Sequence, residues 1–207
     1  MSRRIVVLSA GLSDPSSTRL LADRLAAATV AALDDRGDRA EVDVIELRPL
    51  AHDLTNNLLT GFATGPLAAA QRSVAEADAV IAVTPVFTAS YSGLFKTFVD
   101  VLETDALAGT PVLIAATAGT ARHSLVLDHA LRPLFGYLHA VVVPTGVFAA
   151  SEDWGSAGHG GGAGELSARI DRAASELADL VSRTPPRLSV VRDQFAEVTD
   201  FATLLKG

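Results

Sequence analysis

Short apolar runs alternate along the chain with longer segments in which apolar residues recur every three or four positions. The short runs are predicted β-strands, because a strand that is buried on both faces of a parallel sheet is apolar along most of its length. These strands comprise residues 5–8, 42–47, 79–83, 111–115 and 140–143. The second run begins with alternating apolar and polar residues, a pattern typical of an edge or near-edge strand.

The segments between the strands are predicted to be mainly helical. The first helix follows the N-cap-type residues at 16–18 and continues as far as Gly37. The other helices are predicted over about 66–77, 92–103, 123–138 and 164–183. Residues 48–65 have no regular period and are predicted to form a loop, with a short helix as the alternative.

Strands that alternate with helices predict a parallel sheet covered by helices on both faces, a three-layer α/β sandwich. Five strand–helix repeats without a sixth favour the flavodoxin-like strand order 2-1-3-4-5 over a full dinucleotide-binding fold. Residues 1–184 are expected to form this single domain. Residues 185–207 follow a Pro-Pro pair and are expected to form a C-terminal tail, either docked on its own domain or reaching a second subunit.

The composition narrows the range of functions. The chain has 207 residues, of which 49% are hydrophobic, so a sizeable core is expected and disorder over the whole length is excluded. With 17 basic and 24 acidic residues, the net charge of −7 argues against a nucleic-acid or membrane-surface binder. The absence of cysteine excludes disulfides, a thiol nucleophile and thiolate-bound metals. We expect a cytoplasmic protein without a membrane-spanning segment.

In the predicted strand order, a ligand is expected beyond the carboxyl ends of the first and third strands, where the order reverses. The loop at 9–18 leads into a helix N-terminus, which offers backbone N–H donors and a positive dipole end. It is also rich in hydroxyl groups, carried by Ser13, Ser16, Ser17 and Thr18. A phosphate monoester suits such a site, and ordinary helix capping is the alternative. The next residue, Arg19, either adds a positive charge or points to solvent.

The loop at 84–93 follows the third strand and has the composition of a wall for a planar ligand. Pro85, Val86 and Phe87 form a stiff apolar stretch that an aromatic ring could pack against. Tyr91 adds a polar tip that could reach the edge of such a ligand. The alternative is that Phe87 and Tyr91 are core residues. A third loop, at 116–121, has small residues that would let a ring lie against the main chain.

Several other chemistries lack their sequence patterns. The patterns G-x-x-x-x-G-K-[ST] of nucleotide triphosphatases and G-x-S-x-G of hydrolases are both absent. The histidines never stand four residues apart, as they would in a helical metal site. Residues 158–163 match G-x-G-x-x-[GA] but lie too far from the preceding strand for a dinucleotide site. Residues 158–164 are predicted to be a mobile loop, a candidate lid, anchored by Trp154.

The serine-rich first loop, residues 84–96 and residues 116–123 resemble the NADPH-dependent FMN reductase family of flavodoxin-like flavoproteins. The resemblance covers about residues 3–183. The segment at 125–135 is similar to an actinobacterial subgroup thought to supply reduced FMN to luciferase-like monooxygenases. The C-terminal tail resembles that subgroup as well. The family's first loop usually carries an arginine at a position that Asp14 occupies here.

The resemblance implies binding of FMN and of NADPH or NADH, with hydride transfer to flavin N5 and no side chain acting as acid or base. The residues it assigns to the FMN phosphate are Ser9, Ser16, Ser17 and Thr18. Those assigned to the flavin ring are Pro85, Val86, Phe87, Tyr91, Ala118, Gly119 and Thr120. It also implies a homodimer or homotetramer and a flavin-dependent monooxygenase as partner. The alternatives are a quinone or azo reductase on the same flavin, and a flavodoxin-type electron carrier.

Overall fold

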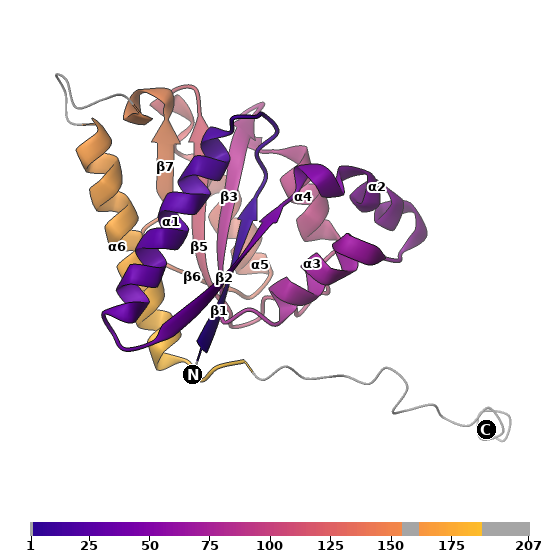
Figure 1. Ribbon diagram of the computed structural model, residues 1–207. Helices are drawn as coiled ribbons and strands as arrows, with labels where there is room; N and C mark the ends of the chain where they lie inside the picture. Colours follow the sequence, from indigo (N-terminus) through magenta and orange to yellow (C-terminus); the bar gives the residue numbers. More distant parts are fainter. Residues whose placement is uncertain (1, 155–161, 188–207) are drawn as a thin grey trace, which may run out of the picture.

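The computed structural model describes residues 2–154 and 162–187, which form a parallel sheet between two layers of helices (Figure 1). The order along the sheet is β2-β1-β3-β5-β6. This is the predicted order 2-1-3-4-5, so the flavodoxin-like α/β class is confirmed. The strands are β1 (Ser2–Ser9), β2 (Arg39–Glu46), β3 (Ala79–Phe87), β5 (Pro111–Ala118) and β6 (Val141–Val142).

The sheet departs from the predicted five strands in two places. The fifth strand is divided into β6 and β7 (Val147–Ala150), which pair in parallel with successive parts of β5. Pro144 stands between them and lacks the N–H that a continuous ladder would need. A short strand, β4 (Ser90–Tyr91), also folds back as an antiparallel hairpin on β3. The prediction of one fifth strand at 140–143 was therefore wrong in extent.

Helices cover the two faces of the sheet from different parts of the chain. One core packs α1 and α6 against Ile5, Val7 and Ile81, and the other packs the remaining helices against Val6 and Val80. In Figure 1, α1 and α6 lie together on one side and α3 and α4 on the other. The helices are α1 (Ser17–Asp34), α2 (Ala51–Thr60), α3 (Gly65–Ala75), α4 (Gly93–Asp100), α5 (Arg132–Tyr137) and α6 (Gly162–Arg183).

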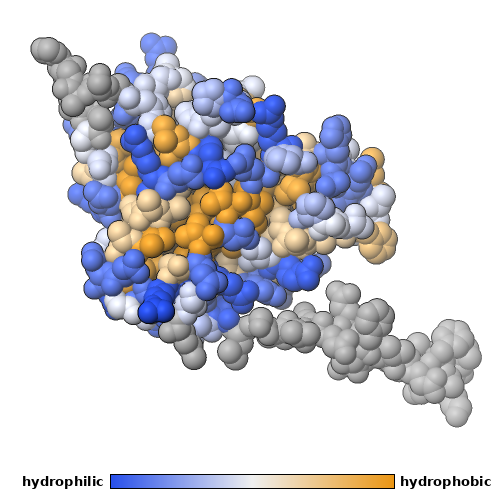
Figure 2. Space-filling view, viewed as in Figure 1, coloured by the Kyte–Doolittle hydropathy of each residue, from blue (hydrophilic) through white to orange (hydrophobic). Residues whose placement is uncertain are grey.

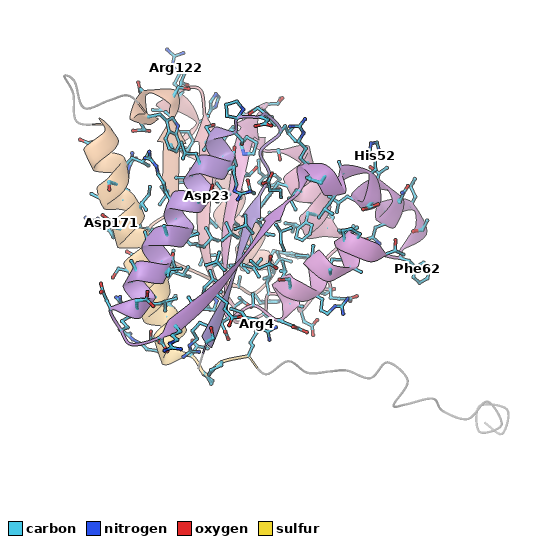
Figure 3. All side chains as sticks on the ribbon, in the orientation of Figure 1. Arg4, Asp23, His52, Phe62, Arg122 and Asp171 are labelled. Atoms are coloured by element: carbon cyan, nitrogen blue, oxygen red, sulfur yellow. The ribbon has the colours of Figure 1, made fainter. Side chains whose placement is uncertain are left out.

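The segment predicted as a loop at 48–65 contains α2, so the short-helix alternative is confirmed. Its buried contacts come from Leu54 and Asn57, while Leu58 and Leu59 are exposed. Two exposed leucines next to a buried asparagine disrupt the periodic pattern by which a helix is usually found. Phe62, just beyond the helix, also points outward (Figure 3).

The predicted helix at 123–138 is irregular. It begins with a 3-10 turn at Ala121–His123, continues as one π-helical turn at Leu127–Leu131, and becomes α5 only at Arg132. Pro133 lies directly after the π-helical turn, and it lacks the N–H that a regular α-helix would donate to the preceding turn. The apolar spacing therefore located the helical segment without revealing the change of helix type.

The strand β2 forms one edge of the sheet and pairs with β1 along its whole length. Its exposed surface carries both apolar and charged side chains, since Val42 is partly exposed between Glu41 and Asp43. Charged residues on an edge strand discourage pairing with other chains. Figure 2 shows an apolar band across this face, where β2 lies between helices in Figure 1. The predicted edge position of this strand is confirmed.

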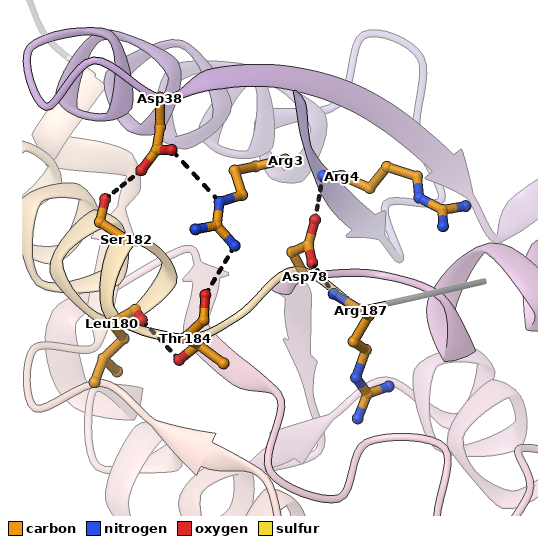
Figure 4. Close-up of polar contacts among 8 residues, drawn as sticks. All are labelled: Arg3, Arg4, Asp38, Asp78, Leu180, Ser182, Thr184 and Arg187. Atoms are coloured by element: carbon orange, nitrogen blue, oxygen red, sulfur yellow. Dashed lines mark hydrogen bonds and ion pairs between the residues drawn. The ribbon is translucent and has the colours of Figure 1, made fainter. Parts of the chain in front are cut away.

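The chain after α6 is attached at the amino ends of the strands (Figure 4). The carboxylate of Asp78 accepts hydrogen bonds from the backbone N–H of Arg187 at 2.7 Å and of Arg4 at 2.8 Å. The side chain of Arg3 donates to the carbonyl of Thr184 at 2.9 Å. Residues 188–207 lie outside the described residues, so the role of the tail stays a prediction. No helix among the described residues is long and apolar enough to cross a membrane.

Candidate functional site

The carboxyl ends of β1, β3 and β5 meet at one edge of the sheet, at the top of Figure 1. The register pairs Ser9 of β1 with Val83 of β3, and Pro85 of β3 with Thr117 of β5. The loops that follow these three strands are those predicted to bind a ligand. The strand order reverses here, which is where ligands bind in open α/β sheets.

The first loop ends in a capped helix whose first N–H groups point outward. The Ser16 hydroxyl accepts a hydrogen bond from the N–H of Arg19 at 3.2 Å and so caps α1. The N–H groups of Ser17 and Thr18 make no hydrogen bond within the described residues. Together with the dipole of an 18-residue helix, they form a suitable place for an anionic oxygen.

The loop is folded tightly around Gly11. A Cβ at this position would stand 2.1 Å from the Oγ of Ser16 and 3.2 Å from the Cβ of Thr18. Any larger residue would therefore displace the side chain that caps α1. Sequence reasoning did not single out Gly11, because the close approach becomes visible only in three dimensions.

The four residues predicted to hold a phosphate occupy different depths. Ser17 is exposed and Ser16 is half-buried, so both hydroxyls are accessible from the loop. Ser9 and Thr18 are buried, and the Thr18 hydroxyl lies 2.8 Å from that of Thr117 in β5. This contact joins the start of α1 to β5, the strand that precedes the third loop. The Thr18 hydroxyl is used in it, so the backbone N–H is the donor that Thr18 has left for a ligand.

Arg19 is held by two carboxylates. Its Nε donates to Asp23 Oδ1 at 2.8 Å, and its Nη1 donates to Glu46 Oε1. Glu46 is the last residue of β2 and stands beside Ser9 in the sheet register. The hydrogen bond with Asp23 is the largest of the influences that raise the pKa of Arg19 above its usual value, and Glu46 adds to it. Arg19 was predicted either to add a positive charge to the loop or to point to solvent. The structure shows instead that its guanidinium is paired with two carboxylates.

The second loop is a hairpin that presents Phe87 to solvent. Its turn residues, Thr88 and Ala89, have positive φ values of 48° and 66°. Such turns usually take glycine or asparagine, so a β-branched threonine here is unfavourable, and strain of this kind is common at functional sites. The side chain of Phe87 is 47% exposed, which argues against the alternative that it belongs to the core. Val86 and Tyr91 are half-buried and face each other across the hairpin.

A buried threonine fixes the hairpin to the next helix. The hydroxyl of Thr84 accepts a hydrogen bond from the N–H of Ser92 at 3.0 Å and donates to the carbonyl of Pro85 at 3.0 Å. Ser92 in turn caps α4 by accepting from the N–H of Phe95 at 3.2 Å. No local pattern in the sequence indicates this role of Thr84, because Ser92 lies eight positions away. Because the Thr84 hydroxyl both donates and accepts a hydrogen bond, this polar residue can be buried in an otherwise apolar strand.

The third loop is small and open. Ala118 is half-buried, while Gly119 and Thr120 are exposed. A Cβ added at Gly119 would meet no atom within 4 Å, so there is space beside the main chain. Arg122 follows immediately and extends away from the top of the sheet (Figure 3). The three loops, with one exposed aromatic ring and uncommitted N–H groups, match the demands of a planar ligand that carries a phosphate.

Two further expectations concern neighbouring parts of the chain. Trp154 is half-buried and has the guanidinium of Arg24 over its ring, 5.0 Å from the centroid. The glycine-rich segment that it was predicted to anchor lies outside the described residues. Within the described ranges, no group of three potential ligands is placed to hold a metal ion.

Comparisons with known proteins identify the family of the chain. A family model described as NADPH-dependent FMN reductase matches residues 3–155. FMN reductase (NADPH) of Pseudomonas aeruginosa is 38% identical over 86% of this chain and 91% of its own, and NADH-dependent FMN reductase SfnE of Pseudomonas putida is 38% identical over 85% and 91%. The X-ray structure of an oxidoreductase from Corynebacterium diphtheriae has a TM-score of 0.85 and 51% identity, covering 89% of this chain and 99% of that one. The resemblance is confirmed, and the chain belongs to the NADPH-dependent FMN reductase family of oxidoreductases.

Proposed function

We propose that this protein is an NAD(P)H-dependent FMN reductase whose flavin site is formed by the three loops. The observation that carries the proposal is the arrangement of these loops at the reversal point of the sheet. Uncommitted N–H groups start α1, an exposed phenyl ring lies on the hairpin, and open main chain follows β5. Such elements suit a ligand that carries a phosphate and a planar ring.

The residues of the first loop would hold the FMN phosphate. The N–H groups of Ser17 and Thr18 and the hydroxyls of Ser16 and Ser17 supply the donors, while Ser9 and the Thr18–Thr117 contact support the loop from below. Hydrogen bonds to a charged phosphate contribute about 1.5–3 kcal/mol each.

The second and third loops would hold the ring. Phe87 and the half-buried Val86 would form the apolar wall, with Pro85, which the structure buries, and Tyr91 supporting it from beneath. The open side would be formed by Ala118, Gly119 and Thr120. When bound, the flavin supplies the hydride-accepting atom, N5. The protein orients the ring and excludes water from one of its faces, which is the general contribution of a protein to cofactor chemistry. We assign no side chain as a general acid or base.

The proposal extends to the context of the reaction. It includes transfer of reduced FMN to a flavin-dependent monooxygenase, a homodimer or homotetramer, and a cytoplasmic location. Of the two relatives that are 38% identical, one is named for NADPH and the other for NADH, so either nucleotide fits the proposal. Two functions compete with this proposal. One is a flavin-dependent reductase of a quinone or azo compound, and the other is a flavodoxin-type electron carrier that binds FMN permanently.

Steady-state oxidation of NADPH and NADH by the purified protein, with increasing FMN, tests the proposal. We expect turnover that rises with FMN and saturates. If a quinone or azo dye added at fixed FMN gave saturable turnover that is faster than turnover with FMN alone, the quinone or azo reductase would be favoured. Tight FMN binding without turnover would favour the electron carrier. If the protein neither bound FMN nor oxidised NADPH or NADH, the flavin site would be refuted.

A further inference from the structure

We infer that Asp23 and Glu46 hold Arg19 in a clamp that keeps its charge away from the phosphate site and so limits the affinity for FMN. The inference rests on the proposed function, because it concerns the same phosphate. Arg19 is thereby a positioning residue for ligand release and does not itself bind the phosphate in the wild-type protein.

The geometry places the clamp next to the phosphate donors. Arg19 belongs to the same helical turn as Ser17 and Thr18, and its own N–H is taken by the Ser16 hydroxyl. Side chains on a helix tilt toward its N-terminus, so a guanidinium at this position lies within reach of that end. Instead, Nε is bound to Asp23 and Nη1 to Glu46.

The charges make the clamp unfavourable for a phosphate. One guanidinium is shared by two carboxylates, and Asp14 adds a further negative charge on the exposed first loop. A phosphate monoester brings nearly two more negative charges at neutral pH. An arginine is the side chain best suited to a phosphate, with a fork of donors that matches its oxygens. Here Nε and Nη1 of that fork are each bound to a carboxylate.

This arrangement fits an enzyme that must let FMN go. Backbone N–H groups and hydroxyls still select the phosphate, but no strong ion pair retains it. An affinity set in this way allows reduced FMN to leave for a second protein.

Glu46→Gln tests the inference, because it removes the negative charge that attracts Nη1 while Asp23 still holds Nε. We expect the Kd for FMN, measured by fluorescence titration, to fall about tenfold, the size of one added charge-assisted hydrogen bond. The Kd for riboflavin, which lacks the phosphate, should not change. The gain should shrink in about 0.5 M salt, since exposed charges are then screened within a few ångströms.

Glu76→Gln is the matched control. It makes the same change of charge and breaks the Arg4–Glu76 pair of 2.6 Å, which lies at the amino ends of the strands. This variant should bind FMN as the wild type does. Adding Arg19→Ala to Glu46→Gln should abolish the gain, while Arg19→Ala alone should change the Kd by less than about twofold.

Two results would overturn the inference. An unchanged or higher Kd in Glu46→Gln would show that the clamp does not govern affinity. A loss of more than about fivefold in Arg19→Ala would show that Arg19 already binds the phosphate. In either case the wild-type protein would still bind FMN and oxidise NADPH, whereas failure of the proposed function would remove both properties from the wild type.

Discussion

Replacing Gly11 with alanine should damage the site and the stability of the protein together. The new Cβ would stand 2.1 Å from Ser16 Oγ and 3.1 Å from Ser16 Cβ, so the serine must move. Moving it breaks the cap of α1, which costs about 1 kcal/mol, and the crowding adds about 1 kcal/mol more. In a chain of this size each kcal/mol lowers the Tm by about 2–4 °C, so we expect a fall of about 4–8 °C.

Thermal unfolding followed by circular dichroism measures this change, and Gly119→Ala is its control. An added Cβ at Gly119 meets no atom within 4 Å, so that variant should keep the wild-type Tm. Ser16→Gly removes both atoms nearest to the new Cβ, so Gly11→Ala should cost less in the Ser16→Gly background than alone. Equal Tm values for Gly11→Ala and Gly119→Ala would refute the reasoning.

Three other predictions test separate contacts. Thr18→Val should lower the free energy of unfolding by about 1–3 kcal/mol, because it strands the buried Thr117 hydroxyl, and Thr18→Val with Thr117→Val should recover part of that loss in denaturant titrations. Phe87→Ala should leave the Tm within about 2 °C, because the ring is half-exposed, yet weaken FMN binding in a fluorescence titration. The hydrogen bond from Ser182, aided by Arg3, lowers the pKa of Asp38, so Asp38→Asn should destabilise the protein at neutral pH. That difference should begin to shrink as the pH falls below the ordinary pKa of 3.8, and it should disappear below the lowered pKa of the folded state.

The sequence predicted the sheet and the positions of the three loops well because their signals are local. Apolar runs such as 79–83 can be buried on both faces only in the middle of a parallel sheet. The hydroxyl-rich loop at 9–18 likewise marks a helix N-terminus directly. The order of the strands followed from analogy with known doubly wound folds that have five strand–helix repeats.

What the sequence could not reveal depends on contacts between distant residues. The clamp on Arg19 joins α1 to the end of β2, and the bond between Thr18 and Thr117 spans 99 positions. Neither partner of such a pair has a distinctive neighbourhood in the sequence. The hairpin turn at Thr88 and Ala89 was missed for another reason, since positive φ values are rare in residues other than glycine or asparagine.

The rate of NADPH oxidation as a function of FMN concentration, in the wild type and in Gly11→Ala side by side, tests the central claim most directly. The account predicts saturation with FMN in the wild type. In the variant it predicts an FMN KM about tenfold higher, because the donors at the start of α1 are displaced. Identical FMN dependence in the two proteins, or no oxidation by the wild type, would contradict it.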